Sequence, residues 1–73
     1  MKITIESTTK IVELNGIPSR LWEGQTDDGI PVIAFIPRIA TPDLTRARDF
    51  AVQLQDCRAP LPVGSAIASD LVL

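Results

Sequence analysis

The stretch that decides the fold is Gly29–Ala40, which reads GIPVIAFIPRIA and is the longest apolar run in the chain. Its apolar residues fall on both faces of an extended strand, with Ile30, Val32, Ala34 and Ile36 on one face and Ile33, Phe35 and Ile39 on the other. A strand with one solvated face alternates apolar and polar residues instead. The stretch therefore predicts a strand that is covered on both sides, with the rest of a small domain wrapped around it.

A turn upstream of this strand predicts the first hairpin. Lys2–Glu6 alternates apolar and polar residues, as a half-buried strand does. Asn15-Gly16 is the preferred pair for a two-residue type I′ turn, in which both central residues have positive φ. This turn places Leu14 opposite Ile17, and it places Lys10 opposite Leu21.

A second turn connects this hairpin to the apolar strand. Asp28-Gly29 is again a candidate for a type I′ turn. On this register Leu21 faces Ile36 and Trp22 faces Phe35. A loop of three residues would shift the register and break the Trp22–Phe35 pairing, so that contact tests the prediction.

A helix is predicted to begin after the apolar strand. Thr41 can cap it, Pro42 suits the first helical position, and Asp43 complements the helix dipole. The helix should run to about Cys57, because Pro60 cannot continue it. One amphipathic stripe follows three- and four-residue spacing and consists of Leu44, Ala47, Phe50, Ala51, Leu54 and Cys57. We expect this stripe to pack on the sheet.

The tail, Val63–Leu73, ends in an apolar segment that predicts a short last strand over Asp70–Leu73. This strand would join the sheet or enter a partner subunit. The predicted fold is therefore α+β and forms a single domain over residues 1–73. It consists of an antiparallel β-meander of three to four strands, one amphipathic helix packed on it, and a short C-terminal strand.

Size and composition predict self-association and argue against catalysis. A chain of 73 residues builds only a small core, so a partner subunit is a common supplement. One cysteine and no histidine exclude an internal disulfide and a structural zinc site within one chain. The lack of histidine also removes the usual general base. We expect a homodimer with no catalytic residues, no cofactor and no metal.

Charge and hydropathy favour a cytoplasmic protein, and they argue against a membrane span and against broad binding to nucleic acid. The net charge of −2 argues against broad electrostatic binding to DNA or RNA. The N-terminus does not have the pattern of a signal peptide, and no apolar run approaches the length of a membrane span. A lone cysteine suits a reducing cytoplasm.

Two groups of residues are candidate sites, and each has a structural alternative. A protein interface would use the candidates Arg20, Trp22, Ile33 and Phe35, since Trp and Arg are enriched at interface hot spots. Packing within the sheet is the alternative for Trp22. An anion patch would use the candidates Arg38, Arg46 and Arg48. The interleaved Asp43 and Asp49 favour a partly neutralised surface instead.

Two further features have simpler structural explanations. Cys57 lies on the apolar stripe of the predicted helix, where a buried small hydrophobe is favoured over a reactive thiol. The adjacent carboxylates of Asp27 and Asp28 are too few for a calcium loop, and turn formation explains them better.

Four segments carry a resemblance to a known group: residues 2–12 (KITIESTTKIV), residues 14–16 (LNG), residues 22–24 (WEG) and residues 29–32 (GIPV). Together they resemble short, uncharacterised proteins encoded by phages and prophages. The resemblance covers mainly the N-terminal half and implies a bacterial cell that carries phage genes. Proteins of this class often bind a host or phage protein. We therefore expect a non-enzymatic protein-binding module, with a small nucleic-acid-binding regulator as the alternative.

Overall fold

The computed structural model describes residues 1–61, and its centre is a three-stranded antiparallel sheet with the order β1-β2-β3. The strands are β1 (Ile3–Leu14), β2 (Ile17–Thr26) and β3 (Pro31–Ile36), followed by the 3-10 helix η1 (Leu44–Arg46) and the helix α1 (Ala47–Gln53). A three-stranded meander with one helix is confirmed. The predicted strand Asp70–Leu73 lies outside the described residues.

The turn between β1 and β2 forms as predicted. Asn15 and Gly16 both have positive φ, 51° and 79°, and Leu14 pairs with Ile17. Pro18 lies opposite Glu13, in the pair next to Leu14–Ile17. Hydrogen-bonded and non-bonded pairs alternate along the ladder, so the Glu13–Pro18 pair is non-bonded. The ladder therefore needs no N–H from Pro18.

Farther along, β1 carries a bulge that the sequence did not predict. Ile11 pairs with Arg20 and Ser7 pairs with Trp22, so three residues of β1, 8–10, lie opposite the single residue Leu21 of β2. The predicted Lys10–Leu21 pairing is therefore wrong. A buried hydrogen bond holds the bulge, since the hydroxyl of Thr8 donates to the carbonyl oxygen of Leu21 at 2.7 Å.

The turn between β2 and β3 has three residues, Asp27–Gly29, instead of two. The backbone N–H of Thr26 donates to the carbonyl oxygen of Ile30 at 2.9 Å, and Gly29 has a φ of 88°. Asp28 does not have the positive φ that a type I′ turn requires.

This longer turn shifts the register of β3 by one residue. Leu21 faces Phe35, and Trp22 faces Ala34. The predicted Trp22–Phe35 pairing is therefore wrong, and the two aromatic side chains lie on opposite faces of the sheet.

The two faces of the sheet have different roles. The core face carries the buried side chains of β2, which are Ser19, Leu21 and Glu23. Leu21 is the only fully buried apolar residue among residues 1–61. The opposite face, which we call the groove face, carries Arg20 and Trp22.

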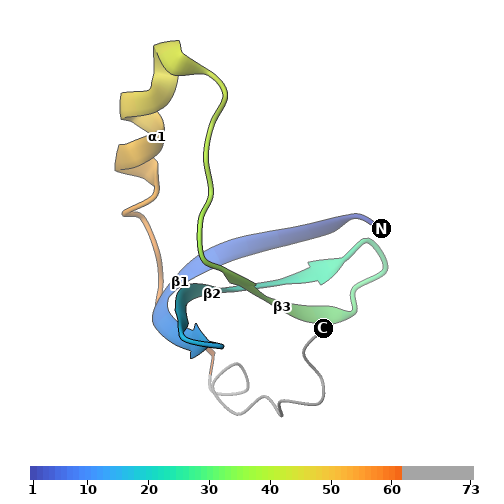
Figure 1. Cartoon of the computed structure of the whole chain (residues 1–73). Coiled ribbons are helices and arrows are strands. Elements are labelled where there is room, and N and C mark those ends of the chain that lie inside the picture. Colours follow the sequence, from blue (N-terminus) through green and yellow to red (C-terminus); the bar gives the residue numbers. More distant parts are fainter. Residues whose placement is uncertain (62–73) are drawn as a thin grey trace.

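The helix does not pack on the sheet, contrary to the prediction. Neither η1 nor α1 has a buried residue, and Leu44 and Val52 are 87% and 64% exposed. Figure 1 shows α1 standing away from the three strands, at the end of two connecting segments. The cap also differs, because Asp43, not Thr41, accepts a hydrogen bond from the N–H of Thr45, at 3.0 Å.

The helix ends before Cys57 because the chain turns back to the edge of β1. The N–H of Arg58 donates to the carbonyl oxygen of Ser7 at 3.3 Å. The N–H of Thr9 donates to the carbonyl oxygen of Arg58 at 2.8 Å. These bonds form a short parallel bridge between Thr8 and Arg58. Residues that would continue the helix instead satisfy backbone groups of the strand, and this tertiary pairing ends α1 at Gln53.

Candidate functional site

A groove of about 550 Å³ lies on the groove face of the sheet and is the candidate functional site. The sheet, the segment that follows β3, and the residue after α1 all contribute walls. We call it the sheet groove, and its lining residues are Ile11, Pro18, Arg20, Trp22, Ile36, Pro37, Arg38, Ile39, Ala40 and Leu54. This lining is apolar apart from two arginines, and it contains no carboxylate.

Trp22 forms part of the floor of the sheet groove because its neighbours across the sheet are small. It pairs with Ser7 on β1 and with Ala34 on β3. Neither side chain is large enough to cover an indole ring, and Trp22 remains partly exposed. The structure therefore leaves an aromatic surface available next to a cation, which is a combination typical of interface hot spots.

Arg20 is held in place at one end of the groove. Its Nη1 donates to the carbonyl oxygen of Thr8 at 2.6 Å and lies 3.6 Å from Sγ of Cys57. Neither Arg20 nor Arg38 forms an ion pair with a carboxylate within the part of the chain that the structure describes. Two positively charged side chains therefore line the groove of a chain whose net charge is −2.

The four residues predicted as an interface do not share one surface. Arg20 and Trp22 line the sheet groove. Ile33 and Phe35 lie on the core face, where Phe35 is opposite Leu21 and Ile33 is opposite Glu23. The one-residue shift of β3 separates the two pairs. It places Ile36, instead of Phe35, on the groove face, where Ile36 lies opposite Arg20.

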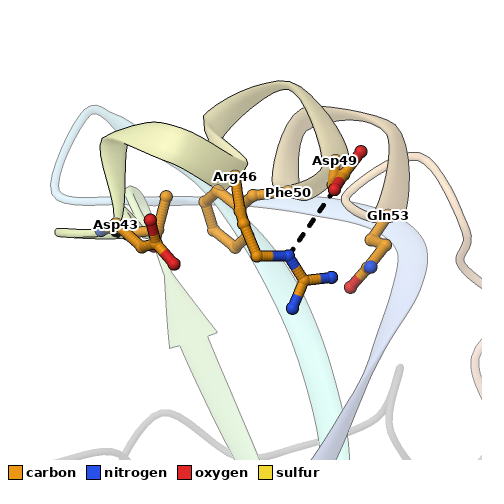
Figure 2. Close-up of a pocket in the computed structure, with 6 residues that line it drawn as sticks. Asp43, Arg46, Asp49, Phe50 and Gln53 are labelled. Carbon is orange, nitrogen blue, oxygen red and sulfur yellow. Dashed lines mark hydrogen bonds and ion pairs between the residues drawn. The ribbon is translucent and has the colours of Figure 1, made fainter.

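The three arginines predicted as an anion patch are also separated. Arg38 lines the sheet groove, whereas Arg46 lines a smaller hollow of about 180 Å³ beside the helix, and Arg48 lines neither. Figure 2 shows the Arg46 side chain between Asp43 and Asp49, with its Nε 3.5 Å from Oδ2 of Asp49. This arrangement favours the predicted alternative of a partly neutralised surface.

The remaining polar candidates have local structural roles. Cys57 follows the helix and is half-buried beside Arg20, so its predicted place on a helical stripe is wrong. Asp28 accepts a hydrogen bond from the hydroxyl of Thr26 at 2.6 Å within the turn. Over residues 1–61, no three acidic, cysteine or histidine side chains gather as metal ligands, and no helix has the length and hydropathy to cross a membrane.

The sequence did not predict the wall of the groove that the residues after β3 and after α1 form. Ile39, Ala40 and Leu54 were assigned to the strand and to the sheet-facing side of the helix, but they line a hollow between these elements. The only signal in the sequence was the proline at position 37, which ends β3 and turns the chain away from the sheet. Comparisons with family models, with curated proteins and with solved structures gave no match.

Proposed function

We propose that this chain is a small, non-enzymatic, cytoplasmic protein-binding module of the phage or prophage type, and that it acts by binding a host or phage protein. The observation that carries the proposal is the sheet groove, which combines apolar walls, a partly exposed tryptophan and two arginines without a carboxylate. Such a surface supports recognition of a protein segment.

The chemistry of the groove supports a proposal about the class of partner. Apolar walls favour aliphatic or aromatic side chains, and the guanidinium groups of Arg20 and Arg38 favour carboxylates. We therefore propose that the partner presents an acidic segment with interspersed apolar residues. Nucleic acid is the less favoured partner, because Arg38, Arg46 and Arg48 do not form one basic surface and Arg46 is paired with Asp49.

Selection from a random peptide display library tests this proposal. We expect the enriched peptides to combine Asp or Glu with apolar residues, and to shift the fluorescence of Trp22, which is the only tryptophan. Arg38→Glu should weaken their binding by about tenfold or more, because it reverses a charge in the groove.

Arg48→Glu is the matched control, since it makes the same change of charge outside the groove. We expect it to leave peptide binding within about twofold of the wild-type value. The absence of enriched peptides, or equal sensitivity to the two charge reversals, would contradict a binding site in the groove. Enrichment of peptides without carboxylates would contradict the proposed chemistry of the partner.

We also propose that the chain forms a homodimer. Among residues 1–61, Leu21 is the only fully buried apolar residue, whereas Ile11, Ile17 and Ile30 are 53%, 55% and 56% exposed. A second copy would cover part of this surface. Sedimentation equilibrium at micromolar concentration measures the association directly.

A further inference from the structure

The outer edge of β3 has no strand beside it within residues 1–61, because β3 lies at the end of the sheet and pairs only with β2. The backbone hydrogen bond between Thr26 and Ile30 sets the phase of this ladder. Since bonded and non-bonded pairs alternate, Val32, Ala34 and Ile36 direct their backbone polar groups toward β2. Ile33 and Phe35 therefore direct theirs away from the sheet.

Prolines limit this edge at both ends. Pro31 and Pro37 have the same parity as Ile33 and Phe35, so each would direct its backbone nitrogen outward, and neither has an N–H. The edge thus offers donors only at Ile33 and Phe35, between two positions that cannot donate. The strand PVIAFI also carries no charged residue, although charged side chains commonly protect an edge from pairing.

From this geometry we infer that β3 pairs antiparallel with β3 of a second copy, about a two-fold axis at Ala34. This inference specifies the surface for the proposed homodimer. In this register Ile33 and Phe35 each exchange both backbone hydrogen bonds with Phe35 and Ile33 of the second copy. Pro31 lies opposite Pro37 of the second copy, so neither donor is opposed by a proline.

The side chains fit the same register. Each Phe35 is the direct neighbour of Ile33 of the second copy, on the core face, and aromatic and β-branched residues are favourable cross-strand pairs. The two copies of Ala34 meet at the axis, where their small side chains permit close approach. The symmetric position of the two prolines about Ala34 favours a second copy of this chain over an unrelated strand.

Cysteine cross-linking tests the register. In the Cys57→Ser background, Ala34→Cys should form a disulfide-linked dimer under mild oxidation. The two Ala34 residues form a non-bonded pair with Cα atoms about 4.5 Å apart, which is within reach of a disulfide. Val32→Cys in the same background is the matched control, because its two copies lie about 13 Å apart along the strands.

We expect the Ala34→Cys protein to cross-link about tenfold faster than the Val32→Cys protein at equal concentration. Equal rates, or faster linking at Val32, would overturn the proposed register. A dimer by sedimentation that does not cross-link at Ala34 would place self-association on another surface. That result would not contradict the proposal that the sheet groove binds a peptide.

A proline substitution tests the edge in the otherwise native chain. Ile33→Pro removes an outward N–H and leaves the bonds to β2 in place, so we expect weaker dimerisation by about tenfold with an unchanged circular dichroism spectrum. Ile33→Val keeps the donor and should retain the wild-type association. Dimerisation of a folded Ile33→Pro protein at the wild-type affinity would overturn the inference, as would a monomeric wild-type protein. If Ile33→Pro fails to fold, the cross-linking rates decide.

Discussion

The carboxylate of Glu23, in the middle of the central strand, accepts a 2.7 Å hydrogen bond from Nη1 of Arg58, which follows the helix. Glu23 is only 6% exposed, and its two oxygens also accept from the backbone N–H of Leu61, at 3.2 and 3.1 Å. The hydrogen bond to Glu23 is the main reason why the pKa of Arg58 is raised above its ordinary value. This contact fixes the segment after α1 against the core face.

Loss of the Glu23 carboxylate should therefore destabilise the protein. We expect Glu23→Ala to lower the free energy of unfolding by about 2 kcal/mol, because it removes the charged acceptor that pairs with Arg58 and Leu61. Urea unfolding measures this difference. Glu13→Ala, which removes an exposed carboxylate from the neighbouring strand, is the control and should change stability by less than about 0.5 kcal/mol. Equal effects of the two substitutions would show that the contact contributes nothing specific.

A second prediction concerns the bulge in β1. Thr8 is fully buried; its hydroxyl donates to the carbonyl oxygen of Leu21 and accepts from the N–H of Lys10 at 3.3 Å. Thr8→Val keeps the shape of the side chain but leaves these groups without partners, so it should cost about 1–3 kcal/mol. Thr8→Ser keeps the hydroxyl and should retain more of the stability in urea unfolding. A Val variant as stable as the Ser variant would contradict this role.

The sequence predicted the elements that local chemistry determines. Asn15-Gly16 forms the expected turn, because a pair with positive φ strongly favours one loop type. Asp28-Gly29 gave the same signal, but Thr26 stabilises a longer loop: its hydroxyl oxygen accepts from the N–H of Ile30 at 3.0 Å. Local patterns did not distinguish these two turns, and the resulting one-residue difference reversed the faces of β3.

Tertiary contacts explain the remaining differences. The stripe Leu44–Cys57 predicted a helix on the sheet, but Arg58 pairs with β1 and Glu23, and this contact draws residues 54–58 out of the helix. Charged partners distant in sequence have no periodic signature, so the pattern of apolar residues gave no sign of them. For the candidate site, Arg20 and Trp22 were identified correctly as neighbours on one face. The groove beside them could not be predicted from the sequence, because its shape depends on the path of the chain after Pro37.

The start of the helix gives a prediction about pH. The pKa of Asp43 is lowered below its ordinary value of 3.8, first by the hydrogen bond from the hydroxyl of Thr45 and then by backbone N–H groups. A depressed pKa stabilises the folded state above the pKa of the unfolded chain, and this contribution is lost as the pH falls through the folded value. NMR titration of Asp43 should therefore give a midpoint below 3.8.

Thr45→Val isolates the cause, because it removes the hydroxyl and keeps the backbone donor. The midpoint of Asp43 should then rise toward its ordinary value. The measurement is the same NMR titration. An unchanged midpoint for Asp43 would show that the hydroxyl of Thr45 does not stabilise the ionised carboxylate.

The position of the helix away from the sheet gives the last prediction. Leu44 belongs to the apolar stripe that was predicted to face the sheet, and Val52 lies outside that stripe, yet both are exposed, at 87% and 64%. Leu44→Gln and Val52→Gln should therefore each change the free energy of unfolding by less than about 0.5 kcal/mol. Leu21→Ala, at the fully buried position of β2, should cost about 2–5 kcal/mol in the same urea experiment. A loss above about 2 kcal/mol for either exposed position would show that the helix packs on an apolar surface in solution.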